Sequence, residues 1–211
     1  MKKNQAAKEI IFYAKKLKEL GFLAGFSGNI SVRISEKSFL ITPSSQDKSQ
    51  IKISDLCETG LNGKIFSKNK PSSEWRLHAF VYENYPKAKA VIHTHPPFIS
   101  VFSCSKVKIN KPLLAEFEIM LKKLPKSGYF TPGSGDLAKA VKKACDSSQT
   151  VILSNHGLLT YATDLKNAFA LTEEAEHFAK IYWLSEIMGR QDPIKSKHIP
   201  ALKKLSENFK F

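Results

Sequence analysis

Val91-Ile92-His93-Thr94-His95-Pro96 is an apolar run that ends in two histidines and a proline. We predict a buried strand over residues 88–95, which Pro96 terminates. Residues two apart on a strand point to the same side. His93 and His95 are therefore expected on one face at a sheet edge or cleft, where two imidazoles can hold one metal ion.

A third histidine, His156, follows another apolar strand, which is predicted at residues 150–154. Gly157 comes next and suits a close approach of the backbone beside an exposed ring. Residues 156–161 are a candidate hairpin partner for the strand. Taken alone, His156 would be interpreted as an ordinary turn histidine. Three neutral histidines with one open coordination position are instead typical of a catalytic Zn²⁺ site.

A helix start is indicated at residues 71–74, where the sequence reads Pro-Ser-Ser-Glu, and the helix is predicted to run to about Tyr85. The free N–H groups and positive dipole end of such a start, with the two serine hydroxyls, would bind phosphate. Glu74 would ligate a metal at rest and accept a proton during turnover; the alternative is an ordinary first-turn carboxylate. His78, one turn later, either supports this site from behind or packs in the core.

The remaining pattern predicts a single α/β domain without a repeat or a dividing linker. Apolar periodicity and end signals indicate helices at 5–20, 135–144 and 164–189, a hairpin of strands 29–34 and 38–42, and a tight turn at 61–64. The last twenty or so residues hold two prolines and five lysines. We expect them to form a loosely attached tail.

The composition supports one globular domain. The 211 residues include 33 Lys and Arg against 19 Asp and Glu, a formal net charge of +14, and 42% of them are hydrophobic. No apolar run approaches the roughly 20 residues that a membrane-spanning helix needs. Cys57, Cys104 and Cys145 are odd in number and widely spaced, so no disulfide framework is expected. We therefore predict a cytoplasmic protein with reduced thiols.

The basic excess is almost entirely lysine, because the only arginines are Arg33, Arg76 and Arg190. Nucleic-acid readers usually rely on Arg for bidentate contacts, so no specific nucleic-acid partner is expected. We interpret the lysines first as a solvated surface. A second interpretation is that their positive field attracts anionic substrates such as sugar phosphates. Non-specific RNA binding is the alternative, with no motif behind it.

Five segments together, in their order along the chain, resemble the class II aldolase/adducin family, and within it the fuculose-phosphate aldolase type. The five segments are Ser27-Gly28-Asn29-Ile30-Ser31, Ile41-Thr42-Pro43-Ser44, Pro71-Ser72-Ser73-Glu74, Val91-Ile92-His93-Thr94-His95-Pro96 and Asn155-His156-Gly157. Five ordered motifs are far more specific than any one of them.

The resemblance implies an α/β fold with three layers, α/β/α, around a central, largely antiparallel sheet. It spans roughly residues 5 to 190, so we expect a catalytic domain over residues 1–190, followed by the lysine-rich tail over 191–211. It further implies a homotetrameric assembly. It also implies a role for each residue that matches a motif. The expected Zn²⁺ ligands are Glu74, His93, His95 and His156, Glu74 is the expected catalytic base, and the expected phosphate-binding residues are Gly28, Asn29, Thr42, Ser44, Ser72 and Ser73.

The function expected from the resemblance is a zinc-dependent aldolase that cleaves a ketose 1-phosphate, of the fuculose 1-phosphate type, to dihydroxyacetone phosphate and an aldehyde. A methylthioribulose-1-phosphate dehydratase is the alternative enzyme. A non-enzymatic adducin-like or nucleic-acid-binding protein is the alternative class. The adducin-like alternative is disfavoured because all three histidines and Glu74 are present. An epimerase is disfavoured because it typically has Asp where Glu74 stands and because no His lies between His95 and His156.

One departure from the aldolase pattern concerns the proton donor to the leaving aldehyde. The aldolase has a tyrosine in the segment after the two-histidine motif, and the comparable stretch here, residues 115–120, has none. Tyr129 lies further on, in a Tyr-Phe-Thr-Pro-Gly run. The difference does not affect the expected metal chemistry. It leaves undecided which aldehyde is released and whether the reaction is an aldol cleavage.

Overall fold

An antiparallel sheet forms the centre of the computed structural model, which describes residues 2–208 and, for residues 137–139, only the backbone. Over these residues the sheet has six strands in the order β3-β2-β1-β4-β6-β5, and every neighbouring pair is antiparallel. The strands are β1 (Asn29–Arg33), β2 (Ser38–Ile41), β3 (Cys57–Gly60), β4 (Ala90–Thr94), β5 (Thr150–Leu153) and β6 (Gly157–Ala162).

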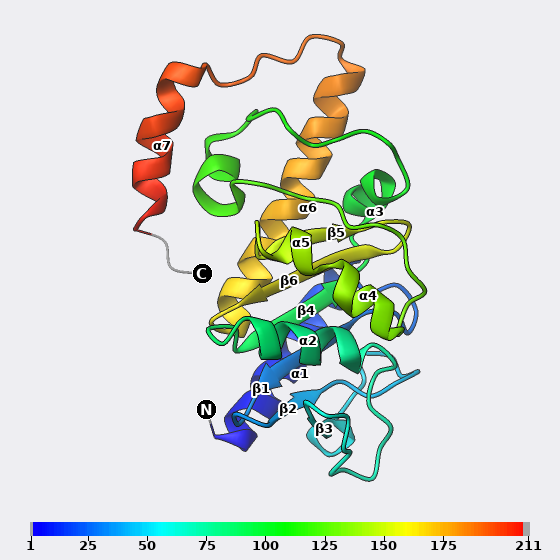
Figure 1. Ribbon diagram of the computed structural model, residues 1–211. Helices are drawn as coiled ribbons and strands as arrows, with labels where there is room; N and C mark the ends of the chain where they lie inside the picture. Colours follow the sequence, from blue (N-terminus) through cyan, green and yellow to red (C-terminus); the bar gives the residue numbers. More distant parts are fainter. Residues whose placement is uncertain (1, 209–211) are drawn as a thin grey trace.

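Helices cover both faces of the sheet and make the three layers (Figure 1). One face carries α1 (Lys3–Glu19), α3 (Pro97–Ser103) and α6 (Leu165–Ile187), and the other carries α2 (Trp75–Asn84) and α5 (Lys142–Cys145), with α4 (Gly135–Ala140) beside α2. The predicted three-layer α/β/α fold is therefore confirmed.

Successive side chains of β4 point to opposite faces of the sheet. Ile92 lies in the core that α1, α3 and α6 form with the sheet, whereas Val91 lies in the core on the α2 side. Because residues two apart on a strand point to the same side, His93 also faces the α2 side. The register places Asn29 of β1 directly opposite His93.

Two predicted elements end differently from expectation. Strand β4 stops at Thr94, because the backbone N–H of His95 donates to the Phe22 carbonyl (2.9 Å) and not to a neighbouring strand. The helix expected over 135–144 is divided into α4 and α5 at Val141, whose side chain is fully buried at the break.

The segment predicted as a tail contains regular structure. A short 3₁₀ turn, η3 (Ser196–His198), leads into α7 (Ile199–Ser206), which contacts the π-helical turn η2 (Phe117–Leu121). The division into a domain over 1–190 and a tail over 191–211 stays a prediction. Among the described residues, no helix combines the length and the apolar character needed to cross a membrane.

Glu176, on α6, connects the long helix to the segment that follows His95. Its two carboxylate oxygens accept hydrogen bonds from the backbone N–H groups of Phe98 and Ile99, each at 2.8 Å. These N–H groups belong to the first turn of α3 and have no partner inside that helix. A buried carboxylate thus caps α3 from a neighbouring helix and holds the start of α3 against α6.

We predict that Glu176→Ala lowers the free energy of unfolding by about 1–3 kcal/mol, because it leaves two N–H groups without an acceptor. Urea denaturation measures the change. Glu173, exposed on the same helix, provides the matched control. Its replacement by alanine is expected to change stability by less than about 0.5 kcal/mol. Equal losses in the two variants would contradict the capping role.

Candidate active site

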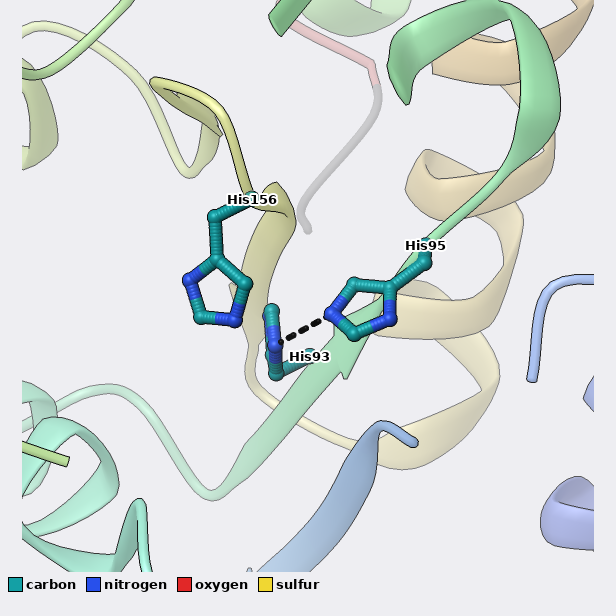
Figure 2. Close-up of side chains that lie close together, drawn as sticks. All are labelled: His93, His95 and His156. Carbon is teal, nitrogen blue, oxygen red and sulfur yellow. Dashed lines mark hydrogen bonds between the residues drawn. The ribbon is translucent and has the colours of Figure 1, made fainter. Parts of the chain in front are cut away.

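Three histidines from two segments meet at the ends of β4 and β6 (Figure 2). His93 lies in β4, His95 follows that strand, and His156 lies in the turn between β5 and β6. The Nε2 atoms of His93 and His95 are 3.0 Å apart, and one nitrogen from each ring lies within 4.8 Å of the others. The sequence prediction that these three imidazoles come together is confirmed.

The turn before β6 depends on two unusual backbone positions. Asn155 has a φ of +52°, in the left-handed region that asparagine tolerates better than most residues. A side chain on Gly157 would collide with the His95 ring and with the Thr94 carbonyl. The absence of a side chain there lets the turn lie close enough to β4 for His156 to reach His93.

Glu74 completes the cluster from the α2 side of the sheet. Its Oε2 lies 3.2 Å from His93 Nε2, and its Oε1 lies 3.4 Å from His156 Nε2. Helix α2 begins at Trp75, so Glu74 is the residue just before the helix and not part of its first turn. Its carboxylate does not cap α2 and is therefore available to the histidines.

Burial keeps the histidines uncharged. It lowers the pKa of His93 and of His95 to about 3 and also lowers the pKa of His156. The Nδ1–H of His93 donates to the Leu158 carbonyl (2.9 Å), which leaves the Nε2 lone pair directed at the other ligand atoms. Metal-binding histidines commonly use their second nitrogen in this way.

This donor set fits a divalent cation. His93 Nε2 and Glu74 Oε2 are both acceptors and face each other at 3.2 Å. Glu74 Oε1 and His156 Nδ1 are buried without a hydrogen-bond partner. Acceptors brought together in this way repel unless a positive charge lies among them, and three neutral imidazoles with one carboxylate are ligands that Zn²⁺ accepts.

A cavity of about 210 Å³ opens directly beside this cluster. Glu74 and His95 line it together with most of the residues predicted to bind phosphate, which are Gly28, Asn29, Ser44, Ser72 and Ser73. A larger cavity of about 970 Å³ lies elsewhere, against Tyr85 and Tyr161, and the three histidines are not in its wall. The smaller cavity is the one that joins metal-ligand chemistry to polar groups.

The expected use of backbone N–H groups at the start of α2 needs correction. The N–H of Ser72 donates to the Thr42 carbonyl (3.1 Å), that of Glu74 to Ser72 Oγ (3.3 Å), and that of Trp75 to the Ser72 carbonyl (3.1 Å). These three donors are already used within the protein. An anion in the cavity would therefore depend more on hydroxyl groups and on a side-chain charge.

Three of the predicted phosphate-binding residues support the cavity or the strands behind it. Thr42 is fully buried, and its Oγ1 accepts from the Ile30 N–H (3.2 Å), so its side chain lies behind the cavity wall. Asn29 lines the cavity, but its Nδ2 donates to Glu74 Oε2 (2.9 Å). Gly28 has a φ of +73°, and a side chain there would meet the His93 carbonyl at 2.9 Å.

The side-chain charge in the cavity is Lys48, which sequence reasoning missed. Lys48 is only 2% exposed, and its Nζ donates to the carbonyls of Phe26 (2.9 Å) and Gln46 (2.7 Å). Burial lowers its pKa to about 8. In the sequence Lys48 follows a polar loop like many surface lysines, and no periodicity marks it as buried.

The comparisons with known proteins agree with this geometry. A family model described as Class II Aldolase and Adducin N-terminal domain matches residues 8–183, and the chain belongs to this family. The chain is 33% identical to an L-fuculose phosphate aldolase of Methanococcus maripaludis over 83% of its own length and 95% of that protein. A solved structure of an L-fuculose 1-phosphate aldolase superposes with a TM-score of 0.86, at 32% identity and 97% coverage of each chain.

Other relatives carry different names. A 5-methylthioribulose-1-phosphate/5-deoxyribulose-1-phosphate aldolase of Rhodospirillum rubrum is 31% identical over 82% of this chain and 78% of that protein. A 3-oxo-tetronate 4-phosphate decarboxylase of Haemophilus influenzae is 28% identical over 78% of this chain and 80% of that protein. The chain is thus an enzyme of the aldolase class of lyases, in a family whose members differ in substrate.

We predict that the purified protein binds about one divalent ion per chain, because the four ligand side chains converge on one point. Elemental analysis of the protein measures the content. The double variant His93→Ala/His95→Ala and the single variant His156→Ala are expected to lose the ion. His198→Ala, on an exposed residue far along the chain, should retain it. Full metal content in the double variant would overturn the assignment.

Proposed function

We propose that this chain is a zinc-dependent aldolase that cleaves a ketose 1-phosphate, of the fuculose 1-phosphate type, to dihydroxyacetone phosphate and an aldehyde. The observation that carries the proposal is the position of Glu74. Its carboxylate lies among three neutral imidazoles and at the same time lines the polar cavity that holds Lys48. A metal ligand set, a candidate base and an anion pocket thus share one small site.

The proposed chemistry divides among these groups. Zn²⁺, when bound by His93, His95, His156 and Glu74, would act as a Lewis acid on the carbonyl oxygen of the substrate. In cleavage the substrate hydroxyl loses its proton as the carbon–carbon bond breaks and the aldehyde forms, and Glu74 gives a proton to the carbon of the three-carbon product. In condensation Glu74 removes a proton from that carbon, and the aldehyde oxygen takes up a proton as the carbon–carbon bond forms. Glu74 Oε1 is suited to this because it has no hydrogen-bond partner.

The substrate phosphate would lie in the polar cavity. The hydroxyls of Ser44, Ser72 and Ser73 are its neutral donors, and Lys48 is its counter-charge. Two of the three Lys48 N–H bonds are used on carbonyls, which leaves one for the ligand. A charge-assisted hydrogen bond in a buried position is stronger than a neutral one and recognises the anion.

The proposal extends to assembly and location. We propose a cytoplasmic homotetramer that takes no specific nucleic acid, with a catalytic domain over 1–190 and a tail over 191–211. Support for association comes from apolar side chains exposed at the end of α6, where Trp183 is 40%, Ile187 63% and Met188 84% exposed. Support for a reducing compartment comes from the free thiols of the three cysteines.

A substrate panel tests the proposal. L-Fuculose 1-phosphate, 5-methylthioribulose 1-phosphate and 3-oxo-tetronate 4-phosphate are assayed side by side on metal-loaded protein. Release of dihydroxyacetone phosphate from L-fuculose 1-phosphate is the expected result. A diketo product without fragmentation would indicate a dehydratase, and release of CO₂ would indicate a decarboxylase. Either outcome without aldol cleavage overturns the proposal.

The panel includes Glu74→Gln as the matched active-site variant. We expect it to retain most of its metal, because the three histidines remain, and to lose turnover by roughly 10²–10⁴-fold with the loss of the base. Near-wild-type turnover in this variant would show that the carboxylate is not the base.

We further predict that Lys48→Met raises KM for the phosphorylated substrate by roughly 10-fold to 100-fold, since it removes a charged hydrogen bond to the phosphate. Steady-state kinetics measures KM and kcat separately, and kcat is expected to change much less. Lys18→Met is the control, because Lys18 pairs with Asp47 (3.5 Å) and does not line the cavity. A similar KM in both variants would contradict the role of Lys48.

A further inference from the structure

A row of buried polar side chains runs between α2 and β1 behind Glu74. Glu74, His78 and Tyr82 are spaced four residues apart, so His78 and Tyr82 share one face of α2 in line with Glu74 just before it. Asn29 and Ser31 are two apart on β1 and face the same side of the sheet. All five residues are at most 7% exposed. We name these five residues the buried polar row.

Hydrogen bonds connect the buried polar row without a gap. Tyr82 Oη lies 2.7 Å from Ser31 Oγ, and Ser31 Oγ lies 2.6 Å from His78 Nδ1. His78 Nε2 lies 2.5 Å from Asn29 Oδ1, and Asn29 Nδ2 lies 2.9 Å from Glu74 Oε2. Each side chain is therefore hydrogen-bonded to its neighbours in the row, and Glu74 takes part through Oε2 only.

The chemistry of the groups decides the direction of every bond. An ionised carboxylate only accepts, so the Asn29 amide must turn its Nδ2 toward Glu74 and its Oδ1 toward His78. The Asn29 oxygen also only accepts, so the proton of the neutral His78 ring is on Nε2. The bare Nδ1 then accepts from the Ser31 hydroxyl, which in turn accepts from Tyr82. All donors point toward Glu74.

We propose that His78 is a positioning residue that fixes the orientation of the Asn29 amide and thereby distinguishes the two oxygens of Glu74: Oε2 is held by Asn29, and Oε1 is the atom that exchanges the proton. The proposal rests on the proposed function in one respect, since it takes Glu74 as the base. The hydrogen-bond partners of the two oxygens support it, because Oε2 has the Asn29 donor and Oε1 has none.

Loss of the His78 donor would act through Asn29. The Asn29 oxygen would be buried without a donor, and an amide rotated by half a turn would direct that oxygen at the Glu74 carboxylate. Two acceptors would then face each other, and the carboxylate would leave its position. This effect changes the placement of the base while leaving the histidine ligands and the phosphate cavity in place.

Three variants test the proposal through the division between kcat and KM. His78→Leu removes the donor and is expected to lower kcat by roughly 10-fold to 100-fold. KM and metal content are expected to stay within about two-fold, since the three histidine ligands, Lys48 and the serines of the cavity are unchanged. His78→Gln restores an N–H donor and should recover most of kcat. Thr172→Val deletes a buried hydrogen bond on α6 (Thr172 Oγ1 to the Ala168 carbonyl, 2.8 Å) and should leave kcat unchanged.

A second readout does not depend on catalysis. ¹⁵N NMR of histidine-labelled protein reports which ring nitrogen carries the proton, and the signals that disappear in His78→Gln identify His78. We expect a proton on Nε2 and a bare Nδ1. A proton on Nδ1, a wild-type kcat in folded His78→Leu, or equal losses of kcat and metal in His78→Leu and His78→Gln would each overturn the proposal. If no ketose phosphate is cleaved, the proposed function is wrong. The His78 tautomer still reports the direction of the hydrogen bonds in the buried polar row, so the two failures can be distinguished.

Discussion

The pairing of β1 with β4 is the constraint on which the site depends. Its register sets Asn29 opposite His93, with both side chains on the face that α2 covers. A slip of one residue would turn every side chain of the strand to the other face. His93 would then enter the core beneath α1 and α6, and Asn29 would lose Glu74. Val91 and Ile92 are both apolar and would fit either core, so the cost of such a slip lies in His93, whose polar ring would enter an apolar core.

The cluster that this register creates is unfavourable in free energy when it is considered alone. Four side chains with acceptor atoms are brought together in a largely buried place, and burial without compensation is unfavourable for such groups. The surroundings supply hydrogen-bond partners on the outer side of the cluster: the Leu158 carbonyl accepts from the His93 Nδ1–H, and Asn29 Nδ2 donates to Glu74 Oε2. On the inner side Glu74 Oε1 has no donor, and the Nε2 atoms of His93 and His95 lie 3.0 Å apart. This asymmetry orients the lone pairs toward one point and suits a cation there.

The meeting of the three histidines and the start of α6 were predictable from the sequence, because the local sequence pattern and the fold agree on them. His93 and His95 end an apolar strand, and His156 with Gly157 follows another, so their meeting needed only a shared sheet. The long helix was expected from residue 164, and Asp164 caps it by accepting from the Asn167 N–H (2.7 Å). These features depend on neighbours in sequence, or on a strand end that is visible in the composition.

Features that depend on distant contacts were not predictable in the same way. The N–H groups before α2 were expected to be free, but Thr42 from another loop takes one of them. Thr42 itself was expected in the phosphate site, and its hydroxyl is used by Ile30. Lys48 has no local mark that separates it from the exposed lysines. In each case the competing partner comes from a segment whose position only the fold defines.

The local charge at the site and the net charge of the chain act differently on an anionic substrate. The net charge of +14 is spread over exposed lysines, and its field is screened beyond about 8–10 Å at physiological ionic strength. Such a field speeds the approach of an anion but does not place it. Lys48 lies beneath the surface and is screened much less. A divalent ion with three neutral imidazoles and one carboxylate would add one net positive charge beside it. A phosphate that enters the cavity would therefore meet positive charge in a defined position, next to the carboxylate that the buried polar row holds.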